Sequence, residues 1–180
     1  MIRVRECSTD ELSPGDLVLL RALFDAAWTE ECDAFTDDDF EHTCGGVHFT
    51  VEASGVVVSH ASVVERVLET AGQRLRTGYV EGVATLPGHR RRGYASAIME
   101  RVTEHIDRTF DLGALGTGLH AFYERLGWVV WRGPTAVRND RGIVPTPEED
   151  GFIMVRLTPR SPALDLSVPI ACEWRSGDVW

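Results

Sequence analysis

The sequence predicts an α/β fold in which helices cover a central, mixed β-sheet. Three observations support this prediction. Three consecutive stretches rich in β-branched residues lie between positions 47 and 86. Segments with the three-and-four apolar spacing of a helix come before and after them. Shorter strand and helix signals then alternate through the second half of the chain. A length of 180 residues fits one domain, which we expect to span residues 1–180.

The N-terminal segment is expected to form one strand and two helices. Residues 2–7 alternate enough for a short first strand. Ser13 then opens a helix whose apolar residues recur every three or four positions: Leu17, Leu20, Leu23, Phe24 and Trp28. The acidic stretch 33–42 follows. Thr36 or Asp37 is the expected N-cap of a brief helix there.

Three strands are predicted in the middle of the chain. Residues 47–53 and 56–67 are joined by Ser54-Gly55, which is a hairpin signal. The third strand covers 74–86 and ends at Pro87-Gly88. The second strand is apolar on both faces over most of its length, which is typical of a central position in the sheet.

The second half is predicted to alternate between helices and strands. A long helix over 90–110 is followed by a strand at 112–115 and by a turn at 116–118 that leads into a helix ending at Gly127, its C-terminal cap. Strands are then predicted at 128–131 and 151–157. Residues 133–150 are expected to form a loop. The tail from 158 to 180 carries Trp174 and Trp180, so we expect it to be packed rather than disordered.

Composition excludes several classes of function. The net charge is −10, with 18 basic and 28 acidic residues, which argues against nucleic acid as a partner. The same charge suits a small cationic substrate, or simply keeps the protein soluble. No stretch approaches the length of a membrane span or a signal peptide, so we expect a cytoplasmic protein without membrane contact.

Cysteine and histidine spacing predicts no metal site. The cysteines lie at positions 7, 32, 44 and 172, without metal-ligand spacing, and are expected to be reduced thiols. Four histidines, His42, His48, His60 and His120, also lack ligand spacing. Polar or packing roles are therefore expected for these histidines.

The most informative motif runs from the third predicted strand into the long helix. Arg90, Gly93 and Ala95 form the pattern R-x-x-G-x-A in a turn before the helix. Small residues let backbone amides face a ligand, and the helix N-terminus adds unpaired N–H groups with positive dipole. This combination indicates an anion site suited to a pyrophosphate. A second block, residues 117–128, carries Tyr123 and ends in Gly127-Trp128.

Together the two blocks resemble the GNAT superfamily of acyl-CoA N-acyltransferases. The resemblance implies that acetyl-CoA is the cosubstrate and that a bulge at Gly82 splays a strand pair to admit the pantetheine arm. Backbone groups of Val83 and Thr85 would bind that arm. Residues of the turn would hold the pyrophosphate, namely Arg90, Arg91, Arg92, Gly93, Tyr94 and Ala95. Glu81 would accept the amine proton, directly or through a water, and Tyr123 would protonate the departing thiolate.

A narrower resemblance covers nearly the whole chain. Five segments look like the aminoglycoside 2′-N-acetyltransferases of actinobacteria: residues 40–48, 78–84, 131–135, 145–151 and 173–180. It implies that the tail packs into the substrate site, where the Trp180 carboxylate serves as a ligand or as a base beside Glu81. Asp39, Glu149 and Asp178 would join Glu81 and Gly82 there. These residues belong to a wider acidic excess made up of Asp33, Asp37, Asp38, Asp39, Glu148, Glu149 and Asp150.

One departure from that family concerns Ala34, which replaces an acid; Asp33 or Asp37 would then have to compensate. The implied reaction is direct transfer of an acetyl group to the 2′-amine of an aminoglycoside in a ternary complex. Neither block contains a cysteine to carry the acyl group. The alternatives are acetylation of another polyamine or a protein N-terminus, and a non-catalytic acyl-CoA sensor. Pairing into a homodimer is expected by analogy alone.

Overall fold

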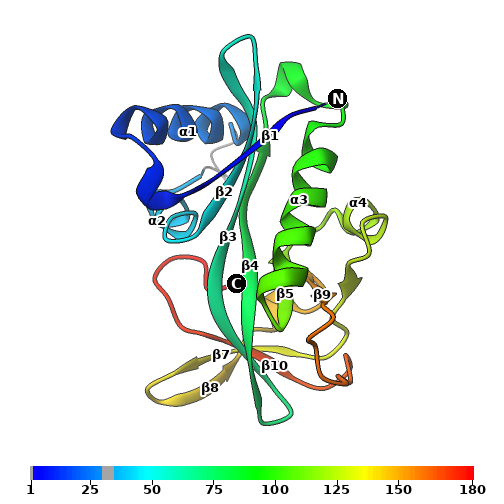
Figure 1. Cartoon of the computed structure of the whole chain (residues 1–180). Coiled ribbons are helices and arrows are strands. Elements are labelled where there is room, and N and C mark those ends of the chain that lie inside the picture. The colour runs from blue at the N-terminus through cyan, green and yellow to red at the C-terminus, as the bar shows by residue number, and fades with distance from the viewer. Residues whose placement is uncertain (1, 30–34) are drawn as a thin grey trace. The chain divides into compact units, whose positions relative to one another are not determined.

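The computed structural model describes residues 2–29 and 35–180 and divides into two compact units. The first unit comprises Met1–Val64 and Val80–Glu104, and the second comprises Glu65–Tyr79 and His105–Trp180. Three long elements run from one unit into the other (Figure 1), namely strands β3 (Val56–Thr70) and β4 (Gln73–Thr85) and helix α3 (Tyr94–Thr109). The expectation of a single domain stays a prediction.

The first unit contains antiparallel strands with helices on both sides. Strand β1 (Val4–Ser8) pairs with β2 (Val47–Ala53), which pairs with β3. Figure 1 shows helices α1 (Pro14–Ala27) and α2 (Asp37–His42) on one side of these strands and α3 on the other. Leu20, Leu23 and Phe24 of α1 pack with Ala84 of β4 in a buried cluster.

Both predicted N-caps begin their helices. The Ser13 hydroxyl accepts the Asp16 N–H at 3.2 Å, and the Asp16 carboxylate accepts the Ser13 N–H at 2.9 Å. A short 3-10 turn, Thr9–Glu11, comes just before α1. Of the two cap candidates for α2, Thr36 is the one the structure supports, because its hydroxyl accepts the N–H of Asp39.

The turn after β4 differs from its prediction. A 3-10 turn, Pro87–His89, follows the strand, and α3 begins at Tyr94 rather than at residue 90. The predicted helix was wrong over its first four positions because Arg91 and Gly93 have left-handed backbones, with φ of +61° and +82°. Beyond Tyr94, the side chains of Ile98, Val102 and Ile106 are buried.

The second unit contains the remaining strands on either side of β3 and β4. Strand β5 (Leu112–Gly116) runs parallel to β4 and antiparallel to β9 (Ile153–Leu157), which also pairs with β6 (Val129–Val130). On the other side β3 pairs with β10 (Ile170–Glu173). Strand β10 runs parallel to β7 (Thr135–Asn139), whose antiparallel partner is β8 (Gly142–Pro145). Helix α4 (His120–Glu124) ends earlier than predicted, because its C-cap is Arg125 rather than Gly127.

The expected loop over 133–150 is wrong, because it contains β7, β8 and a 3-10 turn at Pro147–Glu149. Strand β8 is exposed along its length and ends in a proline, so it lacks the alternation of apolar and polar residues that predicts a strand. The tail is packed, as expected, and contributes β10 to the sheet. Within the described ranges, no helix has the length and apolar character needed to cross a membrane.

Candidate functional site

The turn between β4 and α3 lies largely at the surface. Arg91, Arg92 and Gly93 are exposed, and Tyr94 and Ala95 are half-buried at the start of a helix of 16 residues. Left-handed residues in a turn allow neighbouring N–H groups to converge on an anion. The helix N-terminus adds further N–H donors and a positive dipole. The pyrophosphate site that the sequence predicts at this turn stays a prediction.

The Arg90 side chain contacts two backbone carbonyls, and its predicted contact with a pyrophosphate stays a prediction. Its Nε donates to the Thr85 carbonyl at 3.3 Å, and its Nη2 donates to the Ala27 carbonyl at 3.1 Å. The guanidinium thus braces the turn against the ends of β4 and α1. The Thr85 hydroxyl is also engaged, lying 2.7 Å from the hydroxyl of Ser59.

Glu81 and Gly82 occupy an irregular point of β4. Gly82 has a φ of +56°, and a Cβ there would lie 2.7 Å from the Thr43 methyl group, so only glycine fits. Its carbonyl accepts the Nδ1–H of His60 at 2.8 Å. Glu81 and Val83 flank it and are half-buried. A side chain of β3 therefore hydrogen-bonds to the β4 backbone next to Val83, which the resemblance assigns to the pantetheine arm.

Tyr123 lies in α4 with 6% of its surface exposed. Its ring packs edge-on against Phe122 and Trp128, with centroids 4.9 and 6.3 Å away. Burial raises the pKa of Tyr123 to about 12. The phenol therefore keeps its proton at neutral pH, which is the form that a proton donor requires.

Three predicted substrate residues come together in the second unit. Glu149 is half-buried, and its pKa is raised by burial and then by the nearby carboxylates of Asp178 and Glu148. Trp180 is 4% exposed, and its indole N–H donates to the Thr146 hydroxyl at 3.0 Å, at the start of the same 3-10 turn. The tail and the acidic turn thus form one cluster.

Two arginines that the sequence analysis missed hold this tail. Arg175 donates through Nη2 to the backbone oxygen of Trp180 at 3.1 Å and through Nε to the Asp178 carbonyl at 2.7 Å. The Arg66 side chain is 3% exposed; it donates to the Val179 carbonyl at 2.8 Å and pairs with Glu173 at 3.1 Å. The position of Arg66 within a largely apolar strand is the signal that could have indicated a buried ion pair, because an unpaired buried charge is costly.

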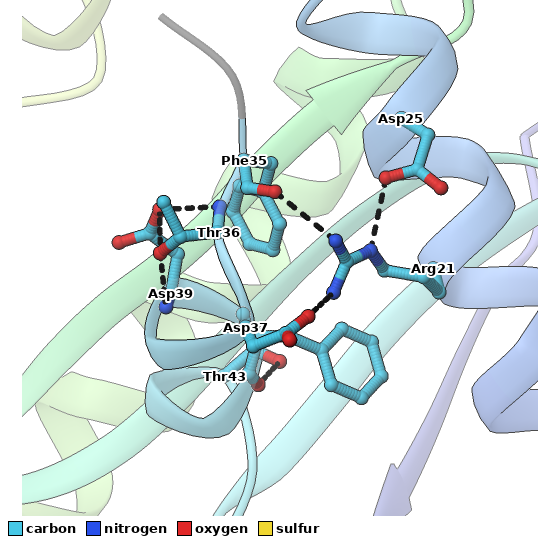
Figure 2. A network of polar contacts seen from close by, with 8 residues as sticks. Arg21, Asp25, Phe35, Thr36, Asp37, Asp39 and Thr43 are labelled. Carbon is cyan, nitrogen blue, oxygen red and sulfur yellow. Dashed lines mark hydrogen bonds and ion pairs between the residues drawn. The ribbon is translucent and has the colours of Figure 1, made fainter.

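Asp39 and Asp37 are both engaged by neighbouring side chains (Figure 2). The Asp39 Oδ2 accepts the N–H and hydroxyl of Thr36, both at 2.8 Å. Figure 2 also shows the Arg21 guanidinium between Asp25, Asp37 and the Phe35 carbonyl. Asp37 is therefore half of an ion pair with Arg21, and its role as a substrate ligand stays a prediction. Asp33 and Ala34 lie outside the described residues.

The pair His48 and His60, expected to have polar or packing roles, is buried between strands. His48 Nδ1 lies 2.9 Å from His60 Nε2. Burial lowers the pKa of His48 to about 4 and that of His60 to about 3, where the neighbouring His48 adds to the effect. In the part of the chain that the structure covers, no three metal-binding side chains cluster. Cys7, Cys44 and Cys172 are free thiols, and Cys32 is not among the described residues.

Acidification is expected to destabilise the fold through this pair. Both folded-state pKa values lie below the usual value of 6.5. Below about pH 6.5 the unfolded chain therefore binds more protons at these two histidines than the folded protein does. The free energy of unfolding is unaffected above pH 6.5. It falls below that pH, by up to about 1.4 kcal/mol per pH unit for each histidine. Urea unfolding at pH 7 and pH 5 measures the slope. A slope of equal size in a chain with both histidines replaced by asparagine would refute this origin.

Comparison with known proteins places the chain among acetyltransferases. A family model described as an acetyltransferase (GNAT) domain matches residues 11–131. The chain is 39% identical over 150 residues to an aminoglycoside 2′-N-acetyltransferase of Mycolicibacterium fortuitum. That alignment covers 81% of this chain and 77% of the relative.

Solved structures share the fold at lower identity. A GNAT family N-acetyltransferase from Escherichia coli in complex with CoA gives a TM-score of 0.66 at 15% identity, covering 96% of this chain and 91% of the other. A GNAT family acetyltransferase from Brucella melitensis in complex with acetyl-CoA gives 0.62 at 12% identity, covering 98% of both chains. Three further matches are longer proteins, of which this chain spans about a third.

Proposed function

Because the chain belongs to the GNAT family of acetyltransferases, we propose that it transfers the acetyl group of acetyl-CoA to the 2′-amine of an aminoglycoside. The observation that carries the choice of substrate is the cluster of Glu149, Asp178 and the Trp180 tail. Burial, and then the carboxylates of Asp178 and Glu148, raise the pKa of Glu149, which a cation bound beside it would lower again. An aminoglycoside supplies several ammonium groups to such a cluster.

Acetyl-CoA is the proposed cosubstrate, with its pyrophosphate on the amides of Arg91 to Ala95. The left-handed backbone at Arg91 and Gly93 supports this placement. Two solved structures of the same fold hold CoA or acetyl-CoA, which is consistent with it. The thioester would lie along the backbone of Val83 and Thr85, beside Gly82.

The proposed reaction is a direct attack. The amine loses a proton to Glu81, directly or through a water, and its nitrogen forms a bond to the thioester carbonyl carbon. The tetrahedral intermediate then collapses, and the carbon–sulfur bond breaks. The departing thiolate takes a proton from Tyr123. We assign the terminal carboxylate of Trp180 to binding an ammonium group rather than to the role of base. Arg175 donates to a backbone oxygen of Trp180, and a neighbouring cation makes a carboxylate a weaker base.

One assay tests this proposal directly. The purified chain is mixed with acetyl-CoA and a panel of aminoglycosides, of which some lack a 2′-amine, and release of the CoA thiol is followed. We expect release only with members that carry the 2′-amine. Release with the others would point to a different amine, and release with none would point to an acyl-CoA sensor.

A chain extended by a few residues after Trp180 provides the matched variant. The extension removes the free carboxylate and with it a charge-assisted hydrogen bond worth about 1.5–3 kcal/mol. Aminoglycoside affinity should therefore fall about tenfold or more, with acetyl-CoA affinity unchanged. An extended chain that acetylates as well as the parent would rule out this role for Trp180.

A further inference from the structure

A line of hydrogen bonds runs through the first unit and ends on the backbone beside Glu81. It begins at the Thr9 hydroxyl, which accepts the N–H groups of Gly45 and Gly46 at 2.9 and 3.2 Å. Thr9 Oγ1 lies 2.8 Å from His48 Nε2. The line continues from His48 to His60 and from there to the Gly82 carbonyl.

The direction of every proton in this line follows from its last member. A carbonyl oxygen only accepts, so His60 Nδ1 carries the proton that reaches Gly82. A neutral imidazole has one N–H, so His60 Nε2 accepts and His48 Nδ1 donates to it. His48 Nε2 then has no proton and accepts from the Thr9 hydroxyl at 2.8 Å, which is shorter than the 3.2 Å between that hydroxyl and its other acceptor, the Gly46 carbonyl.

Burial fixes this arrangement. Both histidines are 0% exposed, and the ring of Phe24 packs edge-on against His60 with centroids 5.1 Å apart. A second proton on His60 would place the N–H groups of the two rings face to face. A second proton on His48 would lie at Nε2, towards the Thr9 hydroxyl, and would put a positive charge on a buried ring. The depressed pKa values of both rings agree with neutral imidazoles at working pH.

The line cannot conduct protons, because the Gly82 carbonyl has none to give and none to pass on. Its effect is mechanical. It fixes the one left-handed position that the described part of β4 contains, between Glu81 and Val83. We propose that His48 and His60 are positioning residues that hold the Gly82 backbone in the geometry acetyl transfer requires. This inference rests on the proposed function for its catalytic consequence alone.

The first experiment needs no activity. Nitrogen-15 NMR of the histidine side chains should show both His48 and His60 protonated at Nδ1 at pH 7. The backbone chemical shifts of Gly82 should report a left-handed conformation in the parent and in H60N, whose amide takes the place of Nδ1. They should shift in H60L, which has no donor. An Nε2-protonated His60, or a Gly82 that is unchanged in H60L, overturns the proposal.

The second experiment measures the catalytic consequence. Displacing the reacting groups by about 1 Å costs up to about 10²-fold in rate, so kcat of H60L should fall by that order while CoA affinity is unchanged. H60N should regain most of the loss. V51A, a core truncation in the neighbouring strand, is the control for simple destabilisation. Equal loss in V51A and H60L overturns the positioning role. If the parent acetylates no aminoglycoside, the proposed function fails and the NMR result still decides the hold on Gly82.

Discussion

Replacing Tyr123 by phenylalanine is expected to lower kcat by about 10²-fold, within the range for loss of a general acid. The edge-on contacts with Phe122 and Trp128 involve the ring, so they persist in the variant. What disappears is a hydroxyl that stays protonated at neutral pH. Without it the thiolate leaves as an anion in a partly buried place. Thiol release under saturating conditions measures the effect.

Two further measurements make the Tyr123 result decisive. Calorimetric affinity for acetyl-CoA should equal that of the parent, because the proposed pyrophosphate contacts lie on the turn before α3. The unfolding midpoint should change little. A variant with near-normal turnover would assign Tyr123 to packing alone and leave the thiolate to be protonated by another group.

Replacing Gly93 by aspartate is expected to weaken acetyl-CoA binding by about 10²-fold. Two effects add. The left-handed backbone, with φ of +82°, costs about 1–2 kcal/mol for a residue with a Cβ. A carboxylate also repels the pyrophosphate, and each 1.4 kcal/mol is a factor of ten in affinity. Titration calorimetry with acetyl-CoA measures the change.

Two variants separate these effects. G93A carries the backbone strain without the charge, and its Cβ meets only the Ile2 Cδ1 at an ordinary 3.7 Å. G88D places the same charge in the preceding 3-10 turn, where a Cβ meets nothing within 4 Å. We expect an intermediate loss for G93A and a small one for G88D. Parental affinity in G93D would remove the phosphate-loop assignment.

The predicted elements succeeded where the signal was local. Ser13 and Thr36 cap their helices because a cap involves residues three positions apart. The start of α3 was misplaced because an arginine in the left-handed region leaves no mark in the sequence. Strand β8 was missed because its residues face solvent and owe their pairing to β7.

The candidate site divides in the same way. The roles of the turn at 90–95 and of Tyr123 are predicted from motifs that lie within short segments, and they stay predictions. The role of Arg66 was not predicted, because its partners, Glu173 and the Val179 carbonyl, are more than 100 residues away along the chain. The same holds for Trp180 and Thr146, whose contact depends on how β7, β8 and the tail pack. Such roles arise from tertiary structure and cannot be read from spacing.

Arg90 joins the carbonyl at the end of β4 to the last carbonyl of α1. A molecule that orders the turn will therefore also order the end of that helix. Thermodynamic reciprocity makes the coupling run both ways, so whatever steadies or loosens the end of α1 changes the affinity of the turn by the same factor. Changes at Ala27, which is not among the proposed phosphate contacts, are therefore expected to alter the affinity for the cosubstrate through Arg90.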